Sequence, residues 1–415
     1  MAIDEPQPPY GLSYTSPGEP LFATPFITAA NGAFNGNPFP LVFPSLNTSI
    51  KNPNSSYNFG EFEPIAGMTA PTPWNTYPYN ENYFFSLERQ FGRDTMFSVS
   101  YVGSQAHHLL LVYSANPGNP ALCLKLSNPA NVAPGSPTCG PFGEDTTYIA
   151  ANGQTIQGTR VGLGPNYSND DYDNSIANSN YNALEATVRY TTAKLAFLIG
   201  YTYSKSIDQG SSISDPGNPY NFAATRAISA FDLPQNFVAS YQYTLPFERF
   251  GHVKYLTDGW QISGIARISS GFPVTLHSDE DNSLMGSIPN GVNNHSLDLP
   301  DYNGEPLDIN SNPRNGLPYF NVGAFSENAL GTPGNASRRS FFGPGEINFD
   351  LALLKSVQFT ESKSLQLRIE AFNALNHTNF FGPAAVNGDI DSTLFGTVVN
   401  AAPPRLMQVA LKFLF

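Results

Sequence analysis

The sequence is poor in charge, in cysteine and in long hydrophobic runs. Charged residues make up 13% of the 415 residues, and 20 Lys+Arg stand against 33 Asp+Glu, for a net charge of −13. Because binding to nucleic acid requires a cationic surface, this balance disfavours a nucleic-acid partner. No stretch of 18 apolar residues occurs, and the apolar patch Leu195–Tyr201 is interrupted by Gly200. No transmembrane helix is therefore expected, but a membrane β-barrel is not excluded, because its strands give weak hydropathy.

The beginning of the sequence and its two cysteines also limit the possibilities. The opening MAIDEPQPPY has neither a basic region nor an apolar core, so no signal peptide is expected there. Cys123 and Cys139 lie sixteen positions apart in a stretch rich in Pro, Asn and Gly. Two cysteines alone cannot build a tetrahedral metal site. We expect a disulfide, as in an oxidising compartment, with two unrelated free thiols as the alternative.

Aromatic and turn-forming residues are abundant. The chain has 31 Phe, 21 Tyr and 2 Trp, together with 35 Gly and 36 Pro, which predicts a turn-rich, mostly β protein. Residues 1–79 show no sustained period and are expected to form an irregular extracellular loop region. From residue 80 to 415, segments of about ten residues alternate apolar and polar side chains, as strands with two unlike faces do.

Nine such segments can be recognised. In one of them, Leu365, Leu367 and Ile369 alternate with Gln366, Arg368 and Glu370. The nine segments are 83–91, 97–101, 184–190, 195–204, 236–243, 260–269, 347–353, 365–371 and 407–415. A soluble sandwich also alternates, so this pattern alone does not decide the fold.

The lengths of the connections are more informative than the alternation. Short links follow the first, third, fifth and seventh segments, at 92–94, 191–193, 247–258 and 360–364. Long links of roughly 114–179, 205–234, 279–345 and 375–404 follow the others. This sorting is typical of a membrane barrel with short periplasmic turns and long extracellular loops. We therefore predict an all-β fold, an antiparallel transmembrane β-barrel segment of about nine strands, with Phe415 on the periplasmic side.

Charged residues lie on the polar faces of the predicted strands. Facing lipid, each would cost up to a few kcal/mol near the midplane, so we predict that they face a wet lumen. Each then either solvates the wall and holds register or contacts a passing solute. They are Glu88, Glu185, Arg189, Arg267, Asp350, Arg368, Glu370 and Lys412.

Aromatic residues near the ends of the strands predict interfacial girdles, because they fall on the apolar faces. Stacking on sugars in a secreted module is the alternative. The residues are Tyr83, Phe91, Tyr101, Tyr190, Tyr203, Tyr243 and Trp260.

Several phrases of the sequence resemble one known family. They include NENYFFSLERQFG, NYNALEATVRYTTAKLAFLIGYTYSKSID, DGWQISGIARISSGFPVT, LRIEAFNALNHTNFFGP and PRLMQVALKFLF. Residues 80–415 resemble the Oar-like group of TonB-dependent outer-membrane receptors. The resemblance implies a bacterial outer-membrane barrel of about 22 strands around a plug, which takes up a bulky solute. No plug or TonB-contacting segment is recognised, so the chain resembles the C-terminal part, and the TonB complex would act only through the missing N-terminal part.

The last strand carries a second resemblance. Val409, Leu411, Phe413 and Phe415 alternate up to a terminal aromatic carboxylate, like the signature that the barrel-assembly machinery reads. Physically, the seam strand must offer its edge to a pairing partner. A last strand that merely ends on Phe is the alternative.

Enzymatic chemistry finds little support. The motifs GxSxG, HExxH and the P-loop are absent, and His107 and His108 are expected on opposite faces of a strand. We expect no catalytic, cofactor or metal site. Two acidic groups offer oxygen ligands for calcium, but solvated charge is the favoured interpretation. They are Asp170, Asp171 and Asp173 in one loop, and Asp279, Glu280 and Asp281 in another.

Uptake or surface binding of an unidentified bulky solute is the function that these features favour. Residues 114–179 and 279–345 are expected to contact it, and the lipid of the outer membrane is expected to surround the wall. Two alternatives remain open: a surface adhesion barrel without transport, and a secreted all-β binding module.

Overall fold

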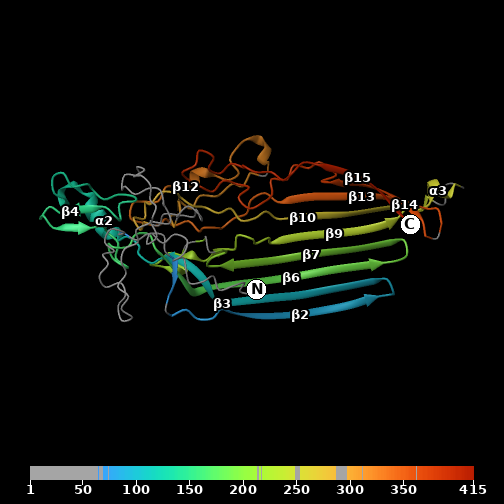
Figure 1. Ribbon diagram of the computed structural model, residues 1–415, viewed down its shortest axis with the longest axis horizontal. Coiled ribbons are helices and arrows are strands. Elements are labelled where there is room, and N and C mark those ends of the chain that lie inside the picture. The colour runs from blue at the N-terminus through green and yellow to red at the C-terminus, as the bar shows by residue number, and fades with distance from the viewer. Residues whose placement is uncertain are drawn as a thin grey trace, which may run out of the picture.

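The computed structural model describes residues 64, 69–72, 74–212, 215, 217–247, 253–286, 297–310, 312–360 and 362–415. Its main feature is one antiparallel sheet in which long strands that follow one another in the chain lie side by side (Figure 1). Within the described ranges the order of its long strands is β15-β14-β13-β10-β9-β7-β6-β3-β2. Their bounds are β2 Tyr79–Phe91, β3 Thr95–Ser114, β6 Asp171–Thr191, β7 Leu195–Asp208, β9 Gln235–Thr244, β10 Trp260–Ser269, β13 Glu346–Gln358, β14 Ser364–Phe372 and β15 Leu406–Leu414.

Shorter elements pair with this sheet or lie in the loops that connect its strands. β1 (Thr69–Pro71) pairs parallel with β6, and β8 (Ala227–Ile228) pairs with β7. Two small hairpins lie in the long loops, β4 with β5 (Thr147–Ile149, Thr155–Gln157) and β11 with β12 (Asp301–Tyr302, Phe325–Ser326). The helical segments are α2 Pro120–Ser127, α3 Lys254–Thr257 and the single-turn 3₁₀ segments Pro129–Asn131, Phe222–Thr225, Pro313–Asn315 and Val322–Ala324. In the part of the chain that the structure describes, no helix is long and apolar enough to cross a membrane.

The predicted segments and the sorting of the links agree with this sheet. Each of the nine segments with alternating side chains falls in one of the long strands, except that Phe415 lies one residue beyond β15, and the antiparallel all-β fold is confirmed. The short links 92–94, 192–194, 245–259 and 359–363 lie at one end of the sheet, where the chain also terminates (Figure 1). The described residues of the long links 115–170, 209–234, 270–345 and 373–405 lie at the other end.

Two strand boundaries were predicted wrongly. Residues 171–179, expected to be loop, form the first half of β6 and pair with β3, and β7 continues to Asp208. β3 has 20 residues, far more than the roughly 9–11 residues with which a strand crosses a bilayer. At about 3.3 Å per residue it spans roughly 66 Å. The sequence DYDNSIANSN of the outer half of β6 is mostly polar and has no apolar alternation, so the pattern could not reveal this part of the strand.

The register gives the sheet one continuous apolar face. Residues that pair directly across neighbouring strands point to the same side. A row of paired residues crosses seven strands on this side: Leu87, Val99, Ala186, Tyr201, Phe237, Ile268 and Ile347. The next row lies on the opposite side and is Glu88, Ser98, Thr187, Gly200, Val238, Arg267 and Asn348. The alternation read from the sequence is thus a property of the whole sheet.

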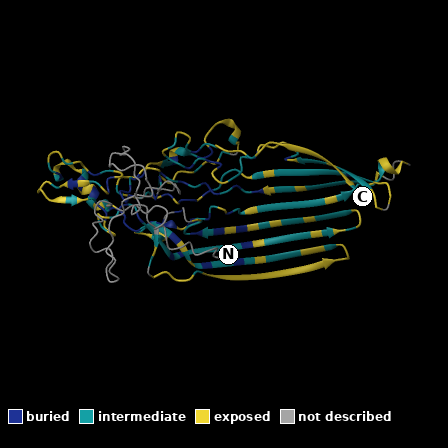
Figure 2. Ribbon diagram, viewed as in Figure 1, coloured by how far each residue is buried: buried dark blue, intermediate teal, exposed yellow. Residues whose placement is uncertain are grey.

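Among the residues that the structure describes, no second layer packs on the apolar face. Leu87, Leu184 and Val409 on this face are 62%, 48% and 68% exposed. The two buried hydrophobic clusters of the described residues lie in the long loops, around Phe320 and around Tyr148. Buried positions accordingly gather at the loop end in Figure 2. A two-layer sandwich would bury the apolar face, so this arrangement excludes a sandwich of these strands.

Both edges of the sheet are open among the described residues. β2 pairs only with β3, and β15 pairs only with β14. Every side chain of β2 is exposed, in keeping with the absence of a described strand on its outer side. The sheet is therefore an arc of wall rather than a closed cylinder.

A β-bulge in β3 overturns one prediction. Between Ala106 and Leu109 the register with β6 shifts, and His108 adopts a φ of 56°. The bulge adds a residue, which brings both imidazoles next to Tyr79, with ring centroids 5.1 Å (His107) and 5.7 Å (His108) from its ring. The two histidines therefore do not face opposite sides as strict alternation requires.

Candidate functional site

The eight predicted lumen charges share the polar face of the sheet. The register puts Glu88, Glu185, Arg189, Arg267, Asp350, Arg368, Glu370 and Lys412 on the side opposite the apolar rows. Three of them take part in ion pairs: Arg267 Nε lies 3.3 Å from Glu346 Oε2, and Arg368 Nη2 lies 2.5 Å from Glu370 Oε1. Such pairs suit a wet surface, where a charge keeps its hydration and needs only modest compensation.

Charges on the apolar face occur near the short-link end. Lys355 belongs to an apolar row, but its Nζ donates hydrogen bonds to the carbonyl oxygens of Leu256 and Asp258 and lies 5.3 Å from the Trp260 ring. Arg89 lies 5.6 Å from the ring of Phe91, the last residue of β2. Long cationic side chains at such positions can place their heads at the membrane surface while their stems cover apolar groups.

Aromatic residues mark two levels on the apolar face. Tyr83 and Phe91 of β2 lie eight positions apart, or roughly 26 Å at 3.3 Å per residue. This spacing matches the ~25 Å apolar band of outer-membrane barrels. Trp260 lies at the level of Phe91, near the short links. Its indole Nε1 donates to the carbonyl of Leu256 at 2.7 Å, and its ring centroid lies 6.3 Å from that of Phe247.

The first long loop folds into a small lobe closed by the two cysteines. Their sulfurs are bonded, with the Cα atoms 5.3 Å apart, and both residues are buried with Leu126 and Tyr148. Leu284, fully buried in the same cluster, comes from the loop that follows β10. The two long loops predicted to contact a ligand therefore pack against each other.

A pair of buried carboxyl groups lies where these loops meet. Glu144 and Asp281 are 1% and 2% exposed, and Asp281 accepts hydrogen bonds from the backbone amides of Phe142, Met285 and Gly286. Burial raises the pKa of Glu144 to about 9, and the hydrogen bond that its protonated carboxyl donates to Asp281 and the charge of Asp281 act in the same direction. The prediction of solvated acidic runs is wrong for Asp281, and for Asp170 at 1% exposure, whereas Asp279 and Glu280 are exposed.

A buried ionic network ties the segment after β10 to the segment after β7. The guanidinium of Arg339 donates to both carboxylate oxygens of Asp215, at 2.9 and 3.0 Å, and Arg338 lies 3.5 Å from Asp208. Burial alone would raise the pKa of Asp215, but Arg339 and Arg338 hold it below its usual value. These charges are paired, so the network fixes the loops together.

A cavity of about 440 Å³ lies beside this network. It is lined on one side by residues 223–226, and on the other by His277 and by Leu297, Leu299 and Arg338. Its wall thus combines cationic, apolar and imidazole groups from two long loops. A volume of this size suits a small-molecule group or the end of a larger solute.

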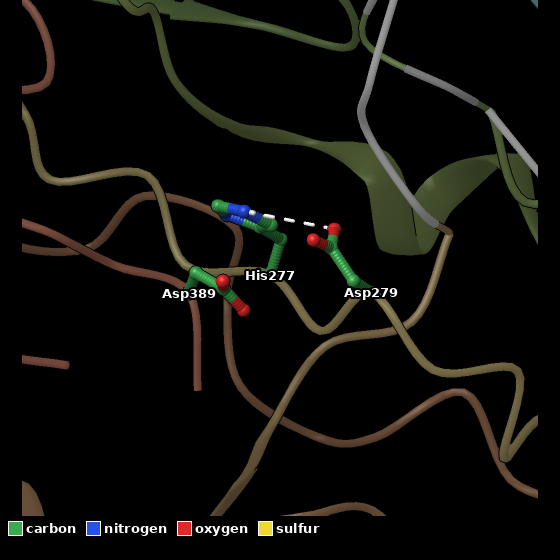
Figure 3. Close-up of side chains that lie close together, drawn as sticks. All are labelled: His277, Asp279 and Asp389. Carbon is green, nitrogen blue, oxygen red and sulfur yellow. Dashed lines mark ion pairs between the residues drawn. The ribbon is translucent and has the colours of Figure 1, made fainter. Parts of the chain in front are cut away.

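Three side chains of types that can bind a metal come together nearby (Figure 3), and one of them, His277, also lines this cavity. His277, Asp279 and Asp389 each offer a ligand atom, and these atoms lie within 4.8 Å of one another. Within the described ranges no other group of three His, Cys, Asp or Glu side chains does so. His277 and Asp389 are 112 positions apart, in loops without periodicity, so no spacing in the sequence could reveal their proximity.

Comparisons with known proteins agree with this architecture. Residues 4–408 match the family model described as an outer membrane beta barrel domain. Since the match covers nearly the whole sequence, the chain belongs to this family, and its location is the bacterial outer membrane. A search of curated proteins found no match.

Several solved structures are similar over part of their length. The transporter YddB from Escherichia coli has 11% identity and a TM-score of 0.42, with 84% of this chain and 34% of that chain covered. The siderophore receptor PirA from Acinetobacter baumannii has 11% identity, a TM-score of 0.37 and coverages of 81% and 32%. The iron transporter FrpB from Neisseria meningitidis has 10% identity and a TM-score of 0.36, with 85% of this chain and 33% of that chain covered. The chain thus spans about a third of the length of these proteins, and we base no functional conclusion on the likeness.

Proposed function

We propose that this chain is the C-terminal part of the barrel of a TonB-dependent outer-membrane receptor that takes up a bulky solute. The observation that carries the proposal is the two-faced sheet with open edges at β2 and β15. In lipid an open edge leaves backbone groups without hydrogen bonds, so further strands must close the wall. The resemblance of residues 80–415 to Oar-like receptors supplies the identity of the larger barrel.

The long loops are proposed to bind the solute on the cell surface. Residues 1–79, of which only 64, 69–72 and 74–79 are described, would belong to the same extracellular side. Leu284 packs in the lobe of the first loop, and the Arg339–Asp215 pair holds the third loop to the second. These contacts support a preformed surface around the cavity rather than separate flexible loops. The polar face of the sheet would line the passage below it, with its charges solvated by lumen water.

The last strand is proposed to be read by the barrel-assembly machinery. Val409, Leu411 and Phe413 share the apolar face and are 68%, 67% and 51% exposed, and Phe415 follows at 90%. The outer edge of β15 has no described partner, so its backbone groups are available for pairing with another strand. Both features support the comparison with the assembly signature.

The proposal is tested by the DNA upstream of this sequence and by the contact of the full gene product with TonB. We expect the reading frame to continue upstream of the Met1 codon into plug-like sequence, and its full product to cross-link to TonB in cells. Unrelated upstream DNA together with no cross-link to TonB would contradict the proposal. An adhesion barrel gives a different result, because deletion would then reduce attachment to surfaces and leave solute uptake unchanged. The secreted module is disfavoured by the uncovered apolar face.

A further inference from the structure

His277, Asp279 and Asp389 lie together on the loop end of the sheet, from two segments far apart in the chain. His277 Nε2 lies 4.0 Å from Asp279 Oδ1, and one ligand atom of Asp389 completes a group within 4.8 Å (Figure 3). We propose that these three side chains bind one first-row divalent cation of the zinc class. Metal binding at this point is independent of whether the chain belongs to a TonB-dependent receptor.

The donor atoms of the three side chains indicate which class of metal ion would bind. Calcium and magnesium favour sites made of oxygen alone, whereas an imidazole nitrogen favours zinc and its neighbours. One nitrogen and two carboxylate oxygens therefore favour a cation such as Zn²⁺. The acidic group Asp170, Asp171 and Asp173 has three carboxyl groups and no imidazole, so it carries no such inference.

Backbone hydrogen bonds hold the two segments in register. The amide of His277 donates to the carbonyl of Gly388, and the amide of Ile390 donates to the carbonyl of His277, both at 3.1 Å. The carboxylate of Asp391 accepts from Ser278 Oγ at 2.8 Å and from the amide of Asp279 at 2.6 Å. Asp391 is thus a positioning residue that fixes the backbone from which two of the three proposed ligands extend.

Only small movements are needed to close the group on a cation. In a tetrahedral zinc site with bonds of about 2.0–2.1 Å, ligand atoms stand roughly 3.3 Å apart. The atoms here lie within 4.8 Å of one another and must approach by at most about 1.5 Å, which rotation of side chains such as the 58% exposed Asp279 can supply. Three protein ligands leave a fourth position for water or for a donor atom of a molecule in the adjoining cavity.

Calorimetric titration of the purified full chain in detergent with ZnCl₂ and with CaCl₂ tests the site. We expect one equivalent of Zn²⁺ to bind, and binding to weaken at least tenfold in the His277→Asn and Asp389→Asn variants. Two matched controls each remove the same kind of group elsewhere. His108→Asn changes an exposed histidine whose positive φ asparagine tolerates, and Glu327→Gln changes an exposed carboxylate. Both are expected to bind Zn²⁺ like the parent chain.

Co²⁺ provides a second measurement that does not depend on a variant. A visible absorption band of tetrahedral Co²⁺ is expected in the parent chain, and addition of Zn²⁺ should remove it. Absence of Zn²⁺ binding, equal binding by His277→Asn and the parent, or preference for Ca²⁺ would each overturn the proposal. A circular dichroism spectrum of each variant identifies loss of folding. None of these outcomes bears on dependence on TonB.

Discussion

At the scale of the residue, the loop region shows how burial changes the chemistry of common side chains. Asp281 and Glu144 are polar residues in Gly- and Asn-rich loops, where exposure is the ordinary expectation. They are buried because Leu284 and Tyr148 build a small core across two loops. Two adjacent carboxyl groups cannot both be ionised there at low cost, so one of them keeps its proton at neutral pH.

The stability of this loop junction should therefore depend on pH. The pKa of Glu144 is raised from 4.5 to about 9, so its stabilising contribution is complete below pH 4.5 and is lost as the pH rises through about 9. We expect the free energy of unfolding to fall between pH 5 and pH 9, by at most about 1.4 kcal/mol per pH unit, and the midpoint of thermal unfolding to fall with it. In Glu144→Gln the amide keeps a hydrogen bond to Asp281 without titrating, so this part of the pH dependence should disappear.

Glu327→Gln is the matched control, since it removes an exposed carboxylate from the third long loop. It should retain the pH profile of the parent chain. If Glu144→Gln and the parent lose stability in parallel between pH 5 and pH 9, the carboxyl pair does not share a proton as described.

At the scale of the element, each strand near the short links separates an apolar side from a polar side. In β14, Gln366 and Leu367 are adjacent and both half-buried, yet the register directs them to opposite faces of the sheet. If lipid covers one face and lumen water the other, their accessibility to reagents must differ sharply.

Cysteine labelling measures this difference. In outer membranes, the Gln366→Cys variant should react with a charged, water-soluble maleimide at least tenfold faster than the Leu367→Cys variant. A thiolate forms readily only where water is present, which is the reason for the expected ratio. Cys123 and Cys139, if bonded as in the structure, add no background. Equal rates at the two positions would contradict the assignment of lipid and lumen faces.

The elements also show what a sequence of this kind can and cannot reveal. All nine segments were predictable, because near the short links the two unlike environments impose a period of two on every strand. The outer half of β6 was missed because Asp171–Ser179 is mostly polar and its buried positions, such as Ser175 and Ala177, do not follow an apolar alternation. The bulge at His107 and His108 was missed as well, because it results from pairing with β6 and leaves no local signal.

The loop chemistry was predictable to a much smaller extent. Sequence composition indicated long loops and two cysteines that could pair, and the structure joins those cysteines. His277 lies near Asp389, and Asp281 is buried against the loop that contains Phe142. In both cases the contact joins two loops more than a hundred residues apart in the sequence. Such contacts depend on the tertiary structure of the loop end, which no periodicity encodes.

At the scale of the whole molecule, the open edges at β2 and β15 decide what the chain can do alone. Half of the backbone amides of β2 point away from β3, and in lipid each unpaired group costs several kcal/mol. A chain whose edges stay open would be driven to pair with another copy or to aggregate. In a complete receptor, additional strands would cover both edges and close the wall.

Hydrogen exchange measured by mass spectrometry tests this closure. In the 415-residue chain alone in detergent, we expect amides of β2 and β15 to exchange at least a hundredfold faster than those of the central β7 and β9, which have strand neighbours on both sides. In the longer product of the same gene, the exchange of β2 and β15 should slow to that of the central strands. The control is β7, whose exchange should be the same in both proteins. If β2 and β15 are already protected in the 415-residue chain, and the protection persists on dilution, the chain closes its own barrel and the missing strands are not needed.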